Sequence, residues 1–128
     1  MIDFSIITVV KNSKKLIHKN MKSVSNQNFK NYEHIIIINS EDKYTINLLK
    51  DISNKKIRVF IFPDKGPYFA MNLGLKKARG KYFTFLNADD YFYKNNVLEL
   101  IKKNYKKYPK INSFYGNVKI FKNNKLFR

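Results

Sequence analysis

The stretch Phe4–Val10, FSIITVV, decides the fold class of this chain. It is rich in β-branched residues and apolar on both faces of the pleat, which is typical of a strand covered on both sides in a parallel sheet. The same pattern returns in residues 33–38 and 56–62, and residues 82–86 predict one more buried strand. Four strands of this kind indicate a sheet that is buried between other layers.

Residues at helical spacing fill the intervals between these strands. Ile17, Met21 and Val24 share one face of a first helix, for which Asn12 or Ser13 is the expected N-terminal cap. Residues 44–52 predict a short second helix. Strands that alternate with helices favour an α/β sandwich of three layers around a mostly parallel sheet.

Small side chains mark the helix that follows the turn at residues 63–67. Ala70, Gly74 and Ala78 share a face with Leu73, so this helix can lie close to the sheet, and Gly80 is its expected C′ residue. A fourth helix is expected from Val97 to Tyr108 and a last strand at residues 113–121. We find no repeat or linker, so residues 1–128 are expected to form one domain.

Composition excludes several classes of protein. The 128 residues contain no cysteine, which excludes disulfide scaffolds, thiolate zinc sites and thiol nucleophiles. The chain has neither a Gly-x-Gly-x-x-Gly motif nor a phosphate-binding Gly-Lys-Ser loop, which disfavours dinucleotide oxidoreductases and P-loop enzymes. Its apolar runs are far shorter than the roughly 20 residues that span a bilayer, and a cytoplasmic location is the default expectation.

The formal net charge is +17, from 26 basic and 9 acidic residues. Most of the cations are lysines, and an excess of Lys, Asn and Ile is typical of an AT-rich genome without any functional demand. The charge is nevertheless uneven, because residues 65–128 hold 15 cations and 3 acids. A basic module that binds a membrane surface or nucleic acid is therefore one alternative, with its basic face in the second half.

Acidic residues gather in the loops that follow the predicted strands. Because ligands of open α/β sheets bind outside the carboxyl ends of the strands, these loops are the candidate site. The adjacent carboxylates of Asp89 and Asp90 repel each other unless a cation sits beside them, and Mg²⁺ or Mn²⁺ prefers such oxygen ligands. Lys65 is a candidate counter-charge for phosphate, whereas His18 and His34 fall outside these loops and are expected to be structural or surface residues.

Four segments together resemble the donor half of family 2 glycosyltransferases, which have the Rossmann-like GT-A fold. They are SIITVVKNS (residues 5–13), SVSNQNFKNYEHIIIIN (23–39), PDKGPYFAMNLGLKKARGKYFTFLNADD (63–90) and YGNV (115–118). The third segment is long, ordered and specific, and the resemblance covers nearly the whole chain.

The resemblance implies an inverting, metal-dependent transfer of a sugar from a nucleotide-diphosphate donor, a UDP-sugar first of all, to an acceptor hydroxyl. The acceptor would be a glycan or a lipid-linked molecule in surface polysaccharide or glycolipid synthesis, and the cofactor Mn²⁺ or Mg²⁺. Asp90 with Asp89 would hold the metal. The residues implied in donor binding are Thr8, Val10, Asn39, Asp64, Gly66, Asn72, Asn87 and Asp89.

The chain departs from the family pattern at Lys11, where an aromatic residue is usual, and at Asn39 and Phe69, where Asp is usual. It is also shorter than typical members, so we expect the C-terminal acceptor-binding part to be absent and assign no residue as general base. A truncated, non-catalytic descendant is therefore a second alternative. The preferred hypothesis is a glycosyltransferase, for which no nucleic-acid partner is expected. Peripheral contact with the inner face of an anionic membrane is compatible with this hypothesis.

Overall fold

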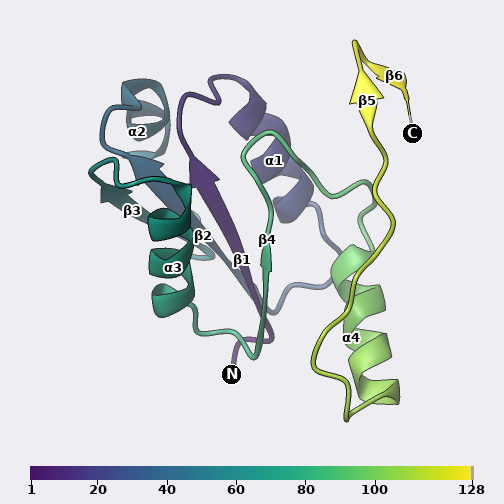
Figure 1. Cartoon of the computed structure of the whole chain (residues 1–128). Helices are drawn as coiled ribbons and strands as arrows, with labels where there is room; N and C mark the ends of the chain where they lie inside the picture. Colours follow the sequence, from purple (N-terminus) through teal and green to yellow (C-terminus); the bar gives the residue numbers. More distant parts are fainter. Residues whose placement is uncertain (128) are drawn as a thin grey trace.

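The structure is a computed structural model that describes residues 1–127 (Figure 1). The alternation of strands and helices predicted from the sequence is confirmed. The elements are β1 (Phe4–Val10), α1 (Leu16–Ser25), β2 (Tyr32–Asn39), α2 (Lys43–Leu49), β3 (Ile57–Phe62), α3 (Pro67–Lys77), β4 (Tyr82–Phe85), α4 (Val97–Lys107), β5 (Phe121–Lys122) and β6 (Lys125–Leu126).

The first four strands form one parallel sheet in the order β3-β2-β1-β4. The register pairs Val10 at the end of β1 with Ile38, and Asn39 at the end of β2 with Phe62. Since all the pairs are parallel, the four carboxyl ends meet at one edge of the sheet. The loops after the strands are thereby brought together, as the candidate site requires.

The sheet lies between two helical layers (Figure 1). On one face α3 packs against the buried side chains of Ile7, Ile35 and Ile37. The other face is covered by α1, α2 and α4, over two clusters that include Ile6 and Ile36. Both faces of the central strands are buried, which explains why apolar residues stand at consecutive positions in them. The predicted three-layer α/β sandwich is confirmed.

Two glycines allow α3 and the turn after it to approach the sheet closely. A Cβ atom on Gly74 would lie 2.4 Å from Cγ2 of Ile7 in β1. The expected C′ role of Gly80 is wrong, because α3 ends at Lys77 and Gly80 has no positive φ. A Cβ atom on Gly80 would instead lie 2.5 Å from the backbone nitrogen of Ser5. Gly80 is needed because the chain passes the start of β1 at close range.

A buried carboxylate fixes the sheet at the end opposite the candidate site. Glu33 accepts hydrogen bonds from the Ser5 hydroxyl at 2.6 Å, the Arg79 amide at 2.6 Å and the Arg58 guanidinium at 2.7 Å. Burial by itself raises the pKa of the Glu33 carboxyl, but these bonds outweigh it and hold the pKa below its ordinary value. This network joins three strands to the turn before β4.

The start of α1 differs from the prediction. The helix begins at Leu16, its N-cap is Lys15, and no side chain caps it. Asn12 and Lys14 have φ angles of 56° and 51°, in the left-handed region that cannot continue into a helix. Neither Asn12 nor Ser13 is therefore the cap. The segment after β1 is a loop that is free to take part in the site.

The last part of the sheet also differs from the prediction. β4 is an edge strand rather than a buried one, and its Phe83 side chain is 55% exposed. Within residues 1–127 no strand forms at 113–120, and only the short antiparallel pair β5–β6 follows. Residues 111–120 run beside α4 (Figure 1) and Phe114 packs into the cluster there, so this segment is held by side chains without a backbone ladder.

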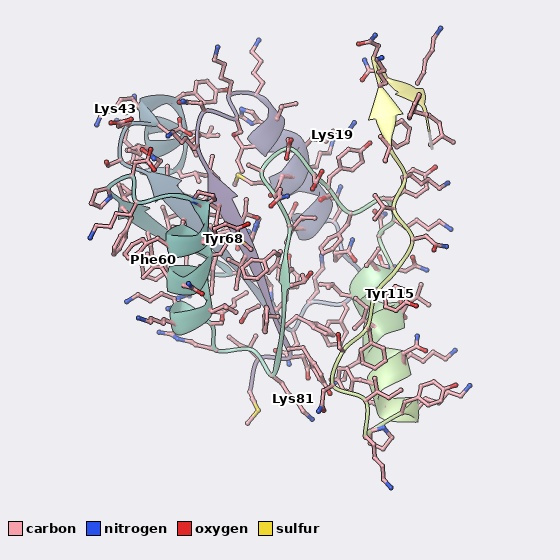
Figure 2. The ribbon with its side chains drawn as sticks, viewed as in Figure 1. Lys19, Lys43, Phe60, Tyr68, Lys81 and Tyr115 are labelled. Carbon is pink, nitrogen blue, oxygen red and sulfur yellow. The ribbon has the colours of Figure 1, made fainter. Side chains whose placement is uncertain are left out.

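The surface of α4 and of the segment after it is basic. Lys103, Lys106, Lys107 and Lys110 are exposed, and Tyr115, which Figure 2 shows on the run beside α4, is fully exposed. In the described part of the chain, none of the helices has the length and apolar character that crossing a bilayer requires.

Candidate functional site

A cavity of about 460 Å³ opens at the carboxyl edge of the sheet. Its walls come from the ends of β1, β2 and β3 and from the start of α3. Four of the residues predicted to bind the donor line it: Val10, Asn39, Asp64 and Gly66. The structure thus brings together residues from three separate loops, at the place where parallel sheets bind ligands.

Charged and polar side chains meet at the mouth of this cavity. The Lys11 ammonium group donates a hydrogen bond to Asp64, and the Gly66 amide donates to the same carboxylate at 3.1 Å. The bond from Lys11 and the bond from Gly66 lower the pKa of Asp64, and Asp64 raises the pKa of Lys11. The nearby Asn39 amide also lowers the pKa of Asp64, and the Asn39 Oδ1 accepts from the Glu41 amide at 2.9 Å. The mouth therefore offers both donors and acceptors.

The floor on the α3 side is aromatic. The rings of Phe62 and Phe69 lie 5.7 Å apart between centroids, and the Lys65 ammonium lies 5.0 Å from the Phe69 centroid. Gly66 has a φ of 86°, which favours glycine, and Pro67 begins α3 directly after it. A flat apolar wall beside hydrogen-bonding groups suits a planar heterocycle.

The turn at residues 87–90, which we term the acidic turn, follows β4 and lies on the other side of β1 from the cavity. The amide of Asp90 donates to the Asn87 carbonyl at 2.9 Å, which closes the turn. Partial burial and the charge of Asp89 raise the pKa of Asp90, against the effect of a hydrogen bond from Asn87. Two carboxylates that resist sharing negative charge fit a hard divalent cation.

No third acidic, His or Cys side chain joins this pair within residues 1–127. A cation held by Asp89 and Asp90 would therefore take its other ligands from water and from the ligand's own oxygens. The donor set of two carboxylates fits Mg²⁺ or Mn²⁺, which are commonly bound in this way beside phosphates.

Two predicted donor-binding residues lie elsewhere. Thr8 is fully buried, and its hydroxyl is 2.9 Å from Nε2 of His34 on the face covered by α1 and α2. Asn72 is exposed on α3 and is not part of the cavity lining. Contact of either residue with a donor stays a prediction. His34 is a core residue in this structure, and His18 is exposed on α1.

Sequence reasoning missed the role of Asp42. This residue is one of the acids in the loops after the strands, which are the predicted site, but its side chain is buried. It caps α2 by accepting from the Thr45 amide at 3.1 Å and hydroxyl at 2.8 Å, and it also accepts from the Asn12 amide at 3.1 Å. Asp42 thus holds the loop after β1 against α2. An Asp directly before a helical segment is an N-cap signal that could have revealed this.

Sequence reasoning also missed three polar side chains on the inner side of α1 and just after it. Asn20, Ser23 and Gln27 all bond to the segment that carries the acidic turn. Their spacing at i, i+3 and i+7, next to the apolar positions Ile17 and Val24, is the signal that could have revealed them, because it places amides on a buried helix face.

Known proteins resemble this chain over most of its length. The sequence profile of Glycosyl transferase family 2 matches residues 5–128. A Haemophilus influenzae protein named as an uncharacterized glycosyltransferase is 37% identical over 98 residues, which cover 74% of this chain and 39% of that protein. The Escherichia coli UDP-Glc:alpha-D-GlcNAc-diphosphoundecaprenol beta-1,3-glucosyltransferase WfaP is 36% identical over 90 residues, which cover 69% of this chain and 36% of WfaP.

The fold is also that of a solved glycosyltransferase. The crystal structure of S. aureus TarS 1–349 in complex with UDP-GlcNAc matches with a TM-score of 0.76 and 24% identity, over 83% of this chain and 32% of that one. This likeness confirms the GT-A fold. The chain spans between about a third and two fifths of the length of these three proteins. With a profile match over nearly all its residues, this chain belongs to glycosyltransferase family 2.

Proposed function

We propose that this chain binds a nucleotide-diphosphate sugar, with UDP-sugars as the first candidates, and serves as the donor half of an inverting glycosyl transfer. One observation carries the proposal: a cavity with an aromatic wall and the acidic turn flank the end of β1 at the same sheet edge. Strands lie about 4.8 Å apart, so an extended ligand that starts over β2 and β3 can reach the turn after β4.

The base would enter the cavity between Phe62 and Asn39. Uracil presents an acceptor, an N–H donor and a second acceptor along one edge, and the cavity mouth presents the Lys11 ammonium, the Asp64 carboxylate and the Asn39 amide. The diphosphate would then cross the end of β1. Asp64 already has a cationic partner in Lys11, which lessens its repulsion of phosphate.

Asp89 and Asp90 would hold a divalent cation beside the diphosphate. A bound cation of this kind offsets the negative charge that develops on a departing diphosphate. The two carboxylates supply the charge that attracts it, and the turn closed by Asn87 presents them to the ligand. Asn87 is also placed to contact the donor, since it is exposed next to them.

The acceptor in this proposal is lipid-linked. The name of WfaP specifies a diphosphoundecaprenol acceptor, and such a molecule stays in a membrane. We extend this acceptor class to the present chain because its exposed lysines on α4 and the exposed Tyr115 suit an anionic membrane surface. The chain would then act at the cytoplasmic face of the membrane.

The test is ligand-induced stabilisation. Saturating UDP-glucose or UDP-GlcNAc with Mn²⁺ should raise the melting temperature on the order of 10 °C, because a ligand at 100 times its Kd adds about 2.7 kcal/mol to a domain of this size. The variant Asp90→Asn keeps the size of the side chain and removes its charge, so its shift should be largely lost.

The matched control is Asp51→Asn, which removes one exposed carboxylate in the connection between α2 and β3, outside the loops that form the candidate site. It should keep the full shift. Wild-type protein whose melting temperature is unmoved by UDP-, GDP- and dTDP-sugars with Mn²⁺ or Mg²⁺ would refute donor binding. Equal shifts in Asp90→Asn and Asp51→Asn would refute the assignment of the metal site.

A further inference from the structure

The segment from residue 86 to residue 98 is fastened to α1 by side chains. It carries the acidic turn, and it follows β4, a strand of four residues that pairs with β1 on one side only within the described chain. An edge strand this short gives its C-terminal loop little backbone support. The position of the two carboxylates therefore depends on contacts from outside the strand.

Asn20 makes the contacts that matter most to the turn. It is fully buried, and its Nδ2 donates to the carbonyl of Asn87 at 2.8 Å, that of Asp90 at 3.1 Å and, more weakly, that of Leu86 at 3.4 Å. One amide group thus joins both ends of the turn. Its Oδ1 is buried without a partner among the described residues. Among the described residues, all the side-chain hydrogen bonds of Asn20 are therefore made by its amide donor group and none by its oxygen.

Two more polar side chains continue the same line of contacts. The Ser23 hydroxyl accepts from the Phe92 amide at 3.0 Å and donates to the Asn20 carbonyl at 2.7 Å. Gln27 donates to the Lys94 carbonyl at 2.7 Å and accepts from the Leu98 amide at 3.1 Å, which also fixes the first turn of α4. Asn20, Ser23 and Gln27 form what we term the α1 clamp.

We infer that Asn20, supported by Ser23 and Gln27, is a positioning residue of the donor site that sets the placement of Asp89 and Asp90. This inference rests on the proposed function, because it assigns a purpose to the turn. Asn20 acts through the backbone of the turn and touches neither donor nor cation. Residues that orient metal ligands in this way typically change metal affinity by about 10–100-fold when they are replaced.

The test compares Asn20→Leu with Val24→Ala. Leucine has the same number and branching of side-chain heavy atoms as asparagine and cannot donate, so the turn loses its contacts while the helix face stays filled. Val24 is buried on the same helix in a cluster with Leu86 and Leu98, and its truncation weakens this core without removing any hydrogen bond to the turn. Both variants should melt at lower temperature than the wild type, which makes Val24→Ala the control for a general loss of stability.

Two readouts separate positioning from stability. In Asn20→Leu, hydrogen exchange at the amides of Asp90 and Phe92 should speed up beyond the change seen in Val24→Ala. UDP binding should lose most of its Mn²⁺-dependent gain, by about 10–100-fold in affinity, while metal-free UDP binding is kept because the cavity lies on the other side of β1. Ser23→Ala, a milder change, should show the same pattern at smaller size.

The outcomes are distinguishable from those of the proposed function. Faster exchange in the turn with an unchanged Mn²⁺-dependent gain would overturn the inference, and so would equal effects in Asn20→Leu and Val24→Ala. If Asn20→Leu does not fold, the same comparison between Ser23→Ala and Val24→Ala decides. Wild-type protein that binds no UDP with Mn²⁺ would overturn the proposed function and the donor role of Asn20 with it.

Discussion

His34 is an imidazole enclosed by the core. Only 1% of it is exposed, and its Nε2 has the Thr8 hydroxyl as partner. Burial lowers the pKa of His34 to about 3, so the ring stays neutral in the folded chain. In the unfolded chain it takes up a proton near its ordinary pKa of 6.5. Below that pH the unfolded state binds more protons, and stability must fall as the pH falls.

We predict that this residue governs stability between pH 6.5 and pH 5. The free energy of unfolding should drop by up to about 1.4 kcal/mol per pH unit in this window because one proton is taken up on unfolding. His34→Gln can keep a hydrogen bond to Thr8 without titrating, so its slope there should be flat. Urea denaturation at half-unit pH steps measures this.

The control for that experiment is His18→Gln. His18 is exposed and its Nε2 lies 2.9 Å from the Tyr44 hydroxyl, and a chain with this change keeps His34 and should keep the slope. A slope of the same size in wild type and His34→Gln would show that other groups control the acid side.

At the residue scale, the sequence reveals which side chains can act chemically, but it reveals less about what surrounds each side chain in the fold. The pair Asp89 and Asp90 could be found because two carboxylates after an apolar strand are unusual. Asp42 has the same chemistry and a different task, since the cap of α2 consumes its oxygens. Lys11 could be named as a departure from the family pattern, but its bond to Asp64 joins residues 53 positions apart. No local pattern encodes such a pairing.

The close contact of α3 and of the turn after it with the sheet depends on two glycines, which have no side chain. Gly74 sits over Ile7, whose β-branched side chain is fixed in the core, and Gly80 sits over the backbone of Ser5. An added methyl group has to displace a side chain at Gly74 and a strand at Gly80. A strand is displaced less easily than a side chain, because moving the strand also disturbs its hydrogen bonds to the neighbouring strands.

We therefore predict a graded response to alanine at three glycines. Gly74→Ala should destabilise the chain by roughly 1–3 kcal/mol, as overpacking does, despite the better helix propensity of alanine. Gly80→Ala should cost more. Gly116→Ala, where nothing lies within 4 Å, should stay within about 0.5 kcal/mol of wild type. Urea midpoints measure the series, and an order other than Gly80, Gly74, Gly116 would contradict the packing described.

At the element scale, the sequence predicts the features that depend on a single helix or strand. β1, β2 and β3 are each mostly apolar and rich in β-branched residues, and the small residues of α3 reveal its close packing. The exposure of β4 could not be predicted in this way, because its apolar run says nothing about how many neighbours the strand has. Residues 113–120 likewise have strand-like composition, but a strand also needs a partner ladder.

Across the whole molecule the excess of positive charge is greatest in the C-terminal part of the chain. The last acidic residue in the sequence is Glu99, and eight lysines and one arginine follow it. Exposed apolar side chains accompany them, among them Tyr115, Val118 and Phe127. Lysines beside exposed aromatic groups are the composition of surfaces that bind anionic bilayers.

We predict that the chain binds vesicles with anionic lipid and releases them as salt rises. Each lysine near such a surface contributes about 1 kcal/mol at low ionic strength, and screening weakens this at higher salt. Replacing Lys103, Lys106, Lys107 and Lys110 by Gln should abolish cosedimentation with vesicles containing phosphatidylglycerol.

The matched control has the same net charge. It replaces four exposed lysines elsewhere, namely Lys22, Lys50, Lys55 and Lys76, by Gln. This variant should still bind. Equal losses in both quadruple variants would mean that total charge, and not the α4 surface, determines binding.

The strand order has a consequence for how the chain is made. β1 is synthesised before the other strands of the sheet, yet it lies inside the sheet and pairs Phe4 with Tyr82. At typical translation rates of 5–20 residues per second, roughly 4 to 16 s separate these two residues on the ribosome. During this time β2 can occupy one side of β1 while the other stays open. Nascent chains halted before residue 82 should therefore be protease-sensitive, and the pairing of β4 with β1 should end this sensitivity.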